Sequence, residues 1–265
     1  MKLRYLAIFF IVIALSSCKW GVPTKQTANV FTDTLNFSYK TVKQKAADCN
    51  AKTDNGCNIV KFTYPVFKGQ QNLNDSVFYR LGAMFQFMAK GDTDFKRGAR
   101  TFFMLNPAPS SNDLQKPPFY PLNEYAKVVR QDSSLTTIET GGYLIKLNNP
   151  KSNVSFINWD TRANKKIELN DLFNPGYEDS LKKIAEHIFR KDEKLSDTAS
   201  LVKDYLFKDG KFALNGNYLI TPYGLRFLYN EGEIKPRNAG FTILFIGYPK
   251  IRTLLKSHTV LARYL

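Results

Sequence analysis

Residues 123–160 read NEYAKVVRQDSSLTTIETGGYLIKLNNPKSNVSFINWD, and this stretch decides the fold. Apolar and polar residues alternate in it with a period of two, which is typical of half-buried strands. The alternating runs are 125–130, 135–139, 143–147 and 154–160. They are separated by turn-forming residues, namely Asp132-Ser133-Ser134, Gly141-Gly142 and Asn148-Asn149-Pro150. Connections this short are too short for parallel crossovers, so the stretch predicts an antiparallel meander.

Two amphipathic helices are predicted on either side of this meander. The first follows capping side chains at residues 74–76 and runs to about residue 90, with apolar residues at helical spacing. The second covers residues 177–194 and carries acidic residues at its start, where the helix dipole favours them. Further short strands are predicted at 34–42, 58–67, 212–214, 218–221, 224–229 and 241–248.

These elements predict an α+β fold, in which antiparallel sheets carry two main amphipathic helices. The prolines between residues 107 and 121 mark a long loop, and the meander begins just after it. We therefore expect an N-terminal α+β subdomain over 30–122 and a C-terminal α+β domain over 123–265.

The first residues have the pattern of a targeting segment. Lys2 and Arg4 precede an apolar run over residues 6–15, whose length of about 15 Å as a helix is half the hydrocarbon core of a bilayer. The run ends in Leu15-Ser16-Ser17-Cys18, which resembles the bacterial lipobox. The resemblance implies a signal peptide over 1–17, lipidation of Cys18 and a tether over 18–29. The alternative is an ordinary signal peptide with an incidental cysteine.

This resemblance implies a lipid-anchored protein of the bacterial cell envelope that faces the periplasm or the cell surface. The lipid anchor would make the membrane its first partner. Outside the cytosol, Cys49 and Cys57 are expected to form a disulfide, because the turn-forming Asn55-Gly56 lies between them. The alternatives are two free thiols or a metal pair, and the absence of a nearby His disfavours the metal pair.

The charge of the chain is strongly positive, with 38 Lys and Arg against 23 Asp and Glu and a formal net charge of +15. Residues 201–265 hold ten of these basic residues against four acidic ones. Such an excess favours anionic lipid headgroups, anionic glycans or an acidic partner. The alternative is a solvated surface without a specific partner. Nucleic acid is not expected as a partner of an exported chain.

The sequence holds little that indicates catalysis. Its two histidines, His187 and His258, are interpreted as structural or exposed residues. Asp160 and Asp171 can be read as an acid/base pair, but turn and cap roles fit their positions better. The phosphate-binding pattern G-x-x-x-x-G-K does not occur. We therefore predict no catalytic residue, no metal site and no cofactor.

The C-terminal half resembles an exported family of unknown function. The resemblance rests on residues 159–173, which end in Ile167-Glu168-Leu169-Asn170-Asp171-Leu172-Phe173, and on residues 224–248, which begin Gly-Leu-Arg-Phe-Leu-Tyr-Asn. In that family the domain forms the extracellular part of a lysozyme-sensing anti-sigma-V factor and accompanies peptidoglycan deacetylase domains. Residues 30–122 resemble the companion domain that precedes it. The candidate binding residues are Tyr143, Arg226, Tyr229 and Arg237.

One departure from this family concerns the glycine pair. Many members follow the two glycines with a residue and then a histidine, whereas this chain has Gly141-Gly142-Tyr143-Leu144. Any role of that histidine is therefore not expected here. Lysozyme binding is not carried over either, because a positively charged protein repels cationic lysozyme.

Together these observations predict a non-enzymatic envelope lipoprotein that binds an envelope protein or a cell-wall glycan. The competing hypothesis is a cell-wall hydrolase or a deacetylase-associated enzyme, and a third is a purely structural protein. A cleft that gathers a histidine with two carboxylates would favour the enzyme. A basic aromatic surface would favour binding.

Overall fold

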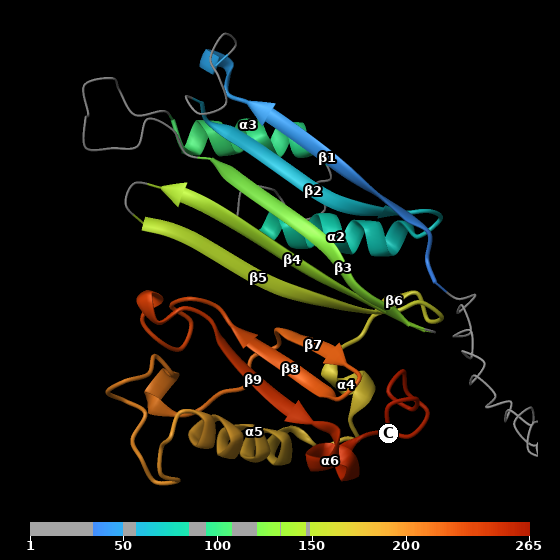
Figure 1. The fold of residues 1–265 in the computed structure, drawn as a ribbon, viewed down its shortest axis with the longest axis vertical. Coiled ribbons are helices and arrows are strands. Elements are labelled where there is room, and N and C mark those ends of the chain that lie inside the picture. Colours follow the sequence, from blue (N-terminus) through green and yellow to red (C-terminus); the bar gives the residue numbers. More distant parts are fainter. Residues whose placement is uncertain (1–33, 50–56, 85–93, 108–120, 133, 147–148) are drawn as a thin grey trace, which may run out of the picture. The chain divides into compact units, whose positions relative to one another are not determined.

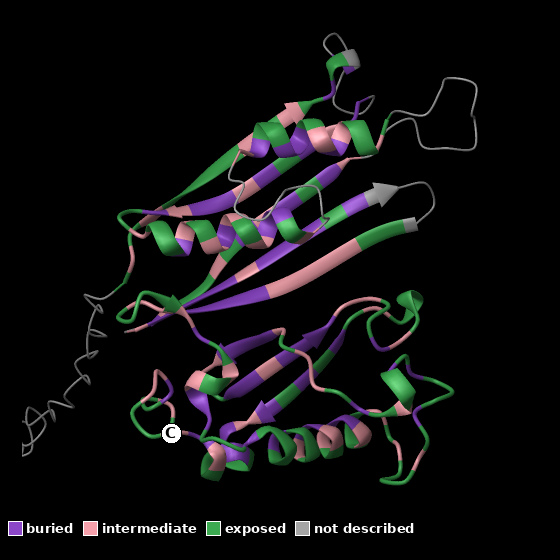
Figure 2. Ribbon diagram, turned by 180° about the vertical axis from the view of Figure 1, so that it is seen from behind, coloured by how far each residue is buried: buried purple, intermediate pink, exposed green. Residues whose placement is uncertain are grey.

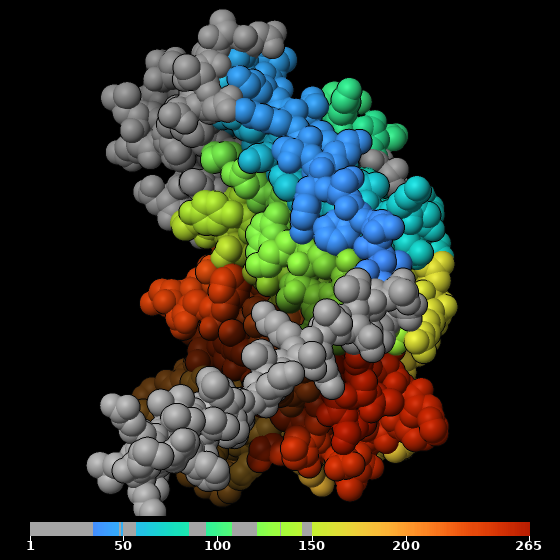
Figure 3. Space-filling model, turned by 45° about the vertical axis from the view of Figure 1, so that its right-hand side comes forward, coloured from blue at the N-terminus to red at the C-terminus, as the bar shows by residue number. Residues whose placement is uncertain are grey.

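A computed structural model describes residues 34–49, 57–84, 94–107, 121–132, 134–146 and 149–265. The described residues belong to one compact unit (Figure 3). The predicted signal peptide, Cys18 and the tether lie outside the described residues. None of the helices in the described ranges has the length and apolar character needed to cross a membrane.

The first sheet has six strands in the order in which the chain forms them (Figure 1). The strands are β1 (Phe37–Lys45), β2 (Ile59–Phe67), β3 (Leu122–Asp132), β4 (Leu135–Lys146), β5 (Asn149–Asp160) and β6 (Lys165–Lys166). Neighbours are antiparallel except β2 and β3, which are parallel because the chain crosses over between them. The meander predicted over 123–160 is confirmed as β3, β4 and β5.

Helices α2 (Gln71–Met84) and α3 (Phe95–Leu105) make this crossover and cover one face of the sheet (Figure 2). Alternate residues of β2, such as Phe62, point to these helices and are buried among their apolar side chains. The rings of Phe62 and Phe95 stack with their centroids 4.3 Å apart. Asp94 caps α3 by accepting the backbone N–H groups of Lys96 and Arg97.

The second sheet has three antiparallel strands, β7 (Tyr218–Thr221), β8 (Gly224–Tyr229) and β9 (Thr242–Gly247). Helix α5 (Glu178–Asp192) packs on it, together with the short helices α4 (Leu169–Leu172) and α6 (Tyr248–Ile251). Buried Phe189 of α5 lies in one core with Phe227 and Leu244 of the strands. The predicted helix over 177–194 and the α+β class are confirmed.

The first helix begins earlier than predicted. Asn74 was expected to cap its start, but α2 begins at Gln71. The side chain of Asn74 instead accepts the N–H of Phe67 and donates to the carbonyl of Phe67, each at 2.9 Å. The first turn of α2 is thus tied to the end of β2. The predicted end of the helix, at residues 85–90, lies outside the described residues.

The glycine pair does not form the predicted turn, and β4 runs straight through it. A Cβ on Gly141 would lie 2.4 Å from the ring of Tyr125, the residue opposite it on β3. Glycine is needed here for close approach of an aromatic ring and not for a turn. Residues 212–214 also form no strand; Phe212 is buried in the core against the rings of Phe189 and Phe207.

The domain boundary predicted between residues 122 and 123 falls after Leu122, the first residue of β3. Strand β3 pairs with β2, so the first sheet takes strands from both sides of that position. Two principal hydrophobic clusters are present, one between the first sheet and α2 and α3, the other between the second sheet and α5. Each sheet therefore has its own core.

Candidate functional site

Asparagine side chains join the two sheets where β5 lies beside β7. The Oδ1 of Asn217 accepts the N–H of Phe156 at 3.1 Å, and its Nδ2 donates to the carbonyl of Val154 at 2.9 Å. The side chain of Asn217 therefore makes hydrogen bonds to the backbone of β5 that a neighbouring strand would otherwise make. The Oδ1 of Asn230 accepts the N–H of Val154 at 2.7 Å.

In the third bridge the asparagine lies on β5, and its side chain bonds to the backbone of β7. Asn158 of β5 donates through Nδ2 to the carbonyl of Tyr218 at 2.8 Å and accepts the N–H of Ile220 through Oδ1 at 2.9 Å. Asn158 is buried, so both halves of its amide are satisfied in the interior. We call these three bridges, made by Asn158, Asn217 and Asn230, the asparagine seam.

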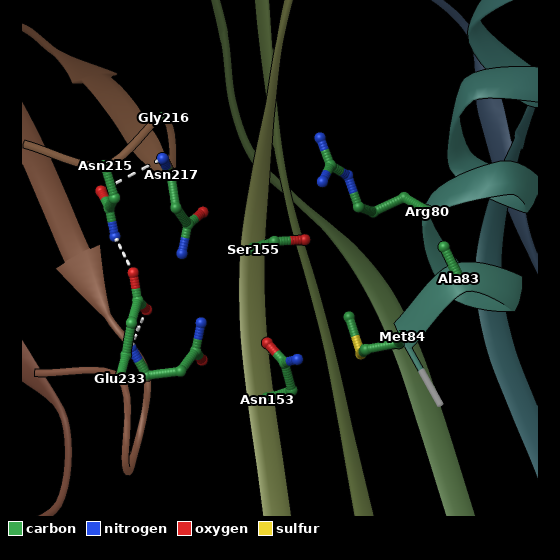
Figure 4. Close-up of a pocket in the computed structure, with 10 residues that line it drawn as sticks. Arg80, Ala83, Met84, Asn153, Ser155, Asn215, Gly216, Asn217 and Glu233 are labelled. Atoms are coloured by element: carbon green, nitrogen blue, oxygen red, sulfur yellow. Dashed lines mark hydrogen bonds between the residues drawn. The ribbon is translucent and has the colours of Figure 1, made fainter. Parts of the chain in front are cut away.

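A polar cleft of about 430 Å³ lies beside the asparagine seam (Figure 4). Helix α2 contributes one wall with Arg80, Ala83 and Met84, which share a side of the helix because they are three or four residues apart. The other lining residues are Asn153 and Ser155 of β5, and Asn215, Gly216, Asn217, Asn230 and Glu233 from the segments around β7 and β8. Amide and hydroxyl groups therefore predominate in this cleft.

Some of these polar groups hold the wall together. The Nδ2 of Asn215 donates to Glu233 Oε1 and to the carbonyl of Leu228, both at 2.8 Å. Glu233 Oε2 accepts the N–H of Asn230 at 2.7 Å. The hydroxyl groups of Ser155 and Thr140 share a hydrogen bond of 2.8 Å. The wall formed by Asn215 and Glu233 is thus fixed before any ligand arrives.

Other groups in the cleft have no partner within the described part of the chain. The guanidinium of Arg80 makes no ion pair there, and the side chain of Asn153 makes no hydrogen bond. The Nδ2 of Asn230 likewise donates to no described residue. These three side chains have hydrogen-bonding capacity available for a ligand.

A buried carboxyl lies in the same layer as Asn153. Glu124 of β3 pairs with Gly142 of β4, which in turn pairs with Asn153 of β5. Glu124 and Asn153 are therefore two strand spacings apart, about 10 Å. No side chain lies between them, because Gly142 has none. Glu124 is only 2% exposed, and neither of its oxygens has a hydrogen-bond partner among the described residues. Burial raises the pKa of Glu124 well above its ordinary value.

The structure does not bring the four predicted binding residues together. Tyr143 is 45% exposed and lies on the face of β4 opposite to the helices, outside the cleft. Arg226 lies with its guanidinium carbon 5.3 Å from the ring centroid of Phe156. Tyr229 is in the core, where its hydroxyl donates to the carbonyl of Ala213 at 2.8 Å. Arg237 is exposed on a short 3₁₀ turn.

The residues considered for acid/base chemistry have structural roles or lie on the surface. Asp160 accepts the N–H groups of Arg162 and Ala163 in a turn, as expected of a turn residue. Asp171 accepts the N–H of Glu168 in the capping box of α4. His187 and His258 are exposed, and neither lines the cleft.

Cys49 and Cys57 lie close together and both are buried. The thiol of Cys57 is 3.7 Å from the carbonyl oxygen of Cys49, and the structure does not join the two sulfurs. Across the described residues, no group of three or more His, Cys, Asp or Glu side chains is placed to hold a metal ion.

The sequence did not indicate the cleft. Asn158, Asn217 and Asn230 lie far apart along the chain, and each resembles an ordinary turn or edge residue in sequence. Arg80 lies on the polar side of an amphipathic pattern, where a solvated residue is expected. The only usable signal is Asn158, a polar residue on the apolar side of a strand pattern that also contains Val154 and Phe156.

The fold and the cleft define a two-sheet α+β protein with a polar cleft beside the junction of its sheets. Residues 170–248, which include α5 and all three strands of the second sheet, match a family described as "Protein of unknown function (DUF3298)". This part of the chain is therefore similar to DUF3298 family domains. No curated protein matches the chain.

Solved structures are similar over most of the chain. A crystal structure of a DUF3298 family protein from Pseudomonas aeruginosa PAO1 is 21% identical, covers 84% of this chain and 95% of its own, and gives a TM-score of 0.64. A DUF3298 family member from Bacteroides fragilis NCTC 9343 is 18% identical, covers 87% and 97% of the two chains, and gives a TM-score of 0.66. At these identities the likeness concerns the fold.

Proposed function

We propose that this chain is a lipid-anchored protein of the bacterial cell envelope whose α+β body binds a cell-wall glycan. The observation that carries the proposal is the cleft beside the asparagine seam, whose walls consist mainly of amide and hydroxyl groups. Amide side chains donate and accept hydrogen bonds, as sugar hydroxyls do, so the two are matched in chemistry. The volume of about 430 Å³ is in the range of small-molecule sites.

The envelope location rests on the sequence. The lipobox-like Leu15-Ser16-Ser17-Cys18 supports lipidation at Cys18, and the acyl chains would hold the body at the membrane. The net charge of +15 supports attraction to the anionic lipids and polymers of an envelope. A relationship to anti-sigma-V factors and to deacetylase-associated domains is part of the same proposal.

We propose a binding role and not catalysis because no histidine lines the cleft and its one acidic residue, Glu233, is hydrogen-bonded on both oxygens. Hydrolysis of a glycan commonly uses a pair of carboxyl groups about the scissile bond. The alternative partner is an envelope protein. Exposed Ile243 and Phe245 on β9 favour that alternative, because they form an apolar stripe on an edge strand.

We further propose that Cys49 and Cys57 form a disulfide in the envelope. Their burial in one cluster supports this pairing, and a short closed loop of this kind stabilises a fold by about 2–3 kcal/mol. Thiol alkylation of the unfolded protein should label neither cysteine before reduction and both after it. Labelling of both without reduction would contradict the pairing.

The proposal is tested with the full chain expressed in a bacterial host and solubilised in detergent. Globomycin, which blocks lipoprotein signal cleavage, should cause a larger precursor to accumulate, and Cys18→Ala should do the same. The purified protein should sediment with intact peptidoglycan and stay in the supernatant once the glycan strands are digested. A protein that does not sediment with intact peptidoglycan would contradict glycan binding.

A further inference from the structure

We infer that the cleft selects an acidic saccharide and that Arg80 binds its carboxylate. The inference rests on the proposed function, since it names the chemical class of the glycan. It begins with the charge of the site. Arg80 and Glu233 are the two charged residues among those that line the cleft, and they come from opposite walls (Figure 4).

The charge of Glu233 is already engaged, whereas that of Arg80 is not. Glu233 accepts hydrogen bonds from Asn215 and from the backbone of Asn230, one on each oxygen. Arg80 is half-buried on α2, and no described carboxylate lies within ion-pair distance of it. A partly desolvated guanidinium without a counter-ion favours an anionic ligand group.

The hydrogen-bonding groups that remain available are mostly donors. Arg80 offers up to five N–H groups, and the Nδ2 of Asn230 and the amide of Asn153 add more. A matching ligand must therefore be rich in acceptors, as a carboxylate with hydroxyl and N-acetyl oxygens is. The planar guanidinium binds a carboxylate through two parallel hydrogen bonds, which a hydroxyl cannot provide.

The remaining wall suits a sugar ring better than an extended peptide. Ala83 and Met84 supply an apolar surface on which the C–H face of a ring can rest. A peptide would need free backbone groups at the edge of β5 to add as a strand. The N–H and carbonyl of Val154 and the N–H of Phe156 are already bonded to Asn217 and Asn230.

Two disaccharides that share N-acetyl groups but differ in charge distinguish recognition of a carboxylate from recognition of a neutral sugar. The first probe is N-acetylglucosaminyl-N-acetylmuramic acid, which carries a carboxylate, and the second is neutral chitobiose. Isothermal titration of the full chain in detergent should show that the acidic disaccharide binds about tenfold more tightly. Arg80→Gln should remove this preference, so that the two disaccharides bind with similar affinity.

The matched control is Arg100→Gln, because Arg100 is exposed on α3 and does not line the cleft. It removes the same charge from the protein and should leave both affinities unchanged. Equal binding of the two disaccharides by the unmodified chain would overturn the inference alone. If Arg100→Gln loses the preference as Arg80→Gln does, the preference comes from the overall charge of the protein. That result would also overturn the inference. Binding of neither disaccharide would contradict the proposed function itself.

Discussion

Replacing Asp132 by alanine is expected to lower the free energy of unfolding by about 3 kcal/mol, because the change leaves two arginines without their shared acceptor. The carboxylate of Asp132 is 3% exposed and lies at the end of β3. It accepts from Arg130 Nε at 3.1 Å and Nη2 at 2.8 Å, from Arg263, and from the hydroxyl of Tyr264. The last residues of the chain are thereby fastened to the first sheet.

The effect of this substitution should depend on pH. Burial opposes ionisation of Asp132, but hydrogen bonds from Tyr264 and Arg130 and the charge of Arg263 outweigh burial and lower its pKa. A carboxyl with a lowered folded-state pKa stabilises the protein above its unfolded pKa of about 3.9, and this stabilisation is lost as the pH falls through the folded-state value. The difference between the variant and the unmodified chain should therefore shrink in acid.

Urea unfolding followed by tryptophan fluorescence at pH 7 and pH 3 measures both effects. Asp132→Asn is the matched control, since an amide keeps one accepting oxygen and removes the charge. We expect it to lie between the alanine variant and the unmodified chain. A change below about 0.5 kcal/mol for Asp132→Ala at pH 7 would show that the C-terminal residues are not held by this carboxylate.

Replacing Glu124 by methionine is expected to raise the free energy of unfolding by about 1–4 kcal/mol at neutral pH. Both oxygens of Glu124 are buried and have no hydrogen-bond partner in the part of the chain that the structure describes. The residue lies beside buried Phe62 in the pairing of β2 with β3. Methionine has a similar length and no polar oxygen, so it removes the cost of burying this group.

The gain from Glu124→Met should grow with pH. Burial raises the pKa of Glu124 in the folded protein. Such a group contributes its stability below the unfolded pKa and loses it as the pH rises through the folded-state pKa. Between the unfolded and the folded-state pKa, the stability gained by Glu124→Met should increase by about 1.4 kcal/mol per pH unit. Urea unfolding between pH 4 and pH 8 measures the slope.

Glu124→Gln is the matched control for the titration. It keeps the shape and the buried polar atoms but cannot ionise, so it should remove the pH dependence and give a smaller gain at low pH than methionine. A methionine variant that is less stable than the unmodified chain at every pH would mean that Glu124 has a stabilising partner.

The fold was predictable where local patterns decide it. The period of two in residues 123–160 and the apolar stripe of 177–194 fix β3, β4, β5 and α5, because each needs only neighbours in sequence to define its buried side. The turn predicted at Gly141-Gly142 is wrong, because glycine is common in turns and also at strand positions that another side chain approaches closely. Only the ring of Tyr125, across the sheet, distinguishes the two.

The cleft was not predictable, because it depends on where the two sheets meet. Asn217 and Asn230 acquire their roles only when their amides reach the edge of β5, and nothing local marks them. The role proposed for Arg80 depends on the absence of a carboxylate near it among the described residues, and spacing along the chain cannot show such an absence. The proposed anchor at Cys18 is the opposite case, since the motif that suggests it is local in the sequence.

Filling the cleft tests the central claim most directly. Ala83 is an exposed residue of α2 that lines the cleft, and Ala83→Trp would occupy the space from the helix side of the cleft. Ala163→Trp makes the same change at an exposed turn outside the cleft and serves as the control. Sedimentation of both full-length variants with intact peptidoglycan is measured beside the unmodified chain. We predict that Ala83→Trp stays in the supernatant while Ala163→Trp sediments, whereas sedimentation of both variants alike would contradict glycan binding in this cleft.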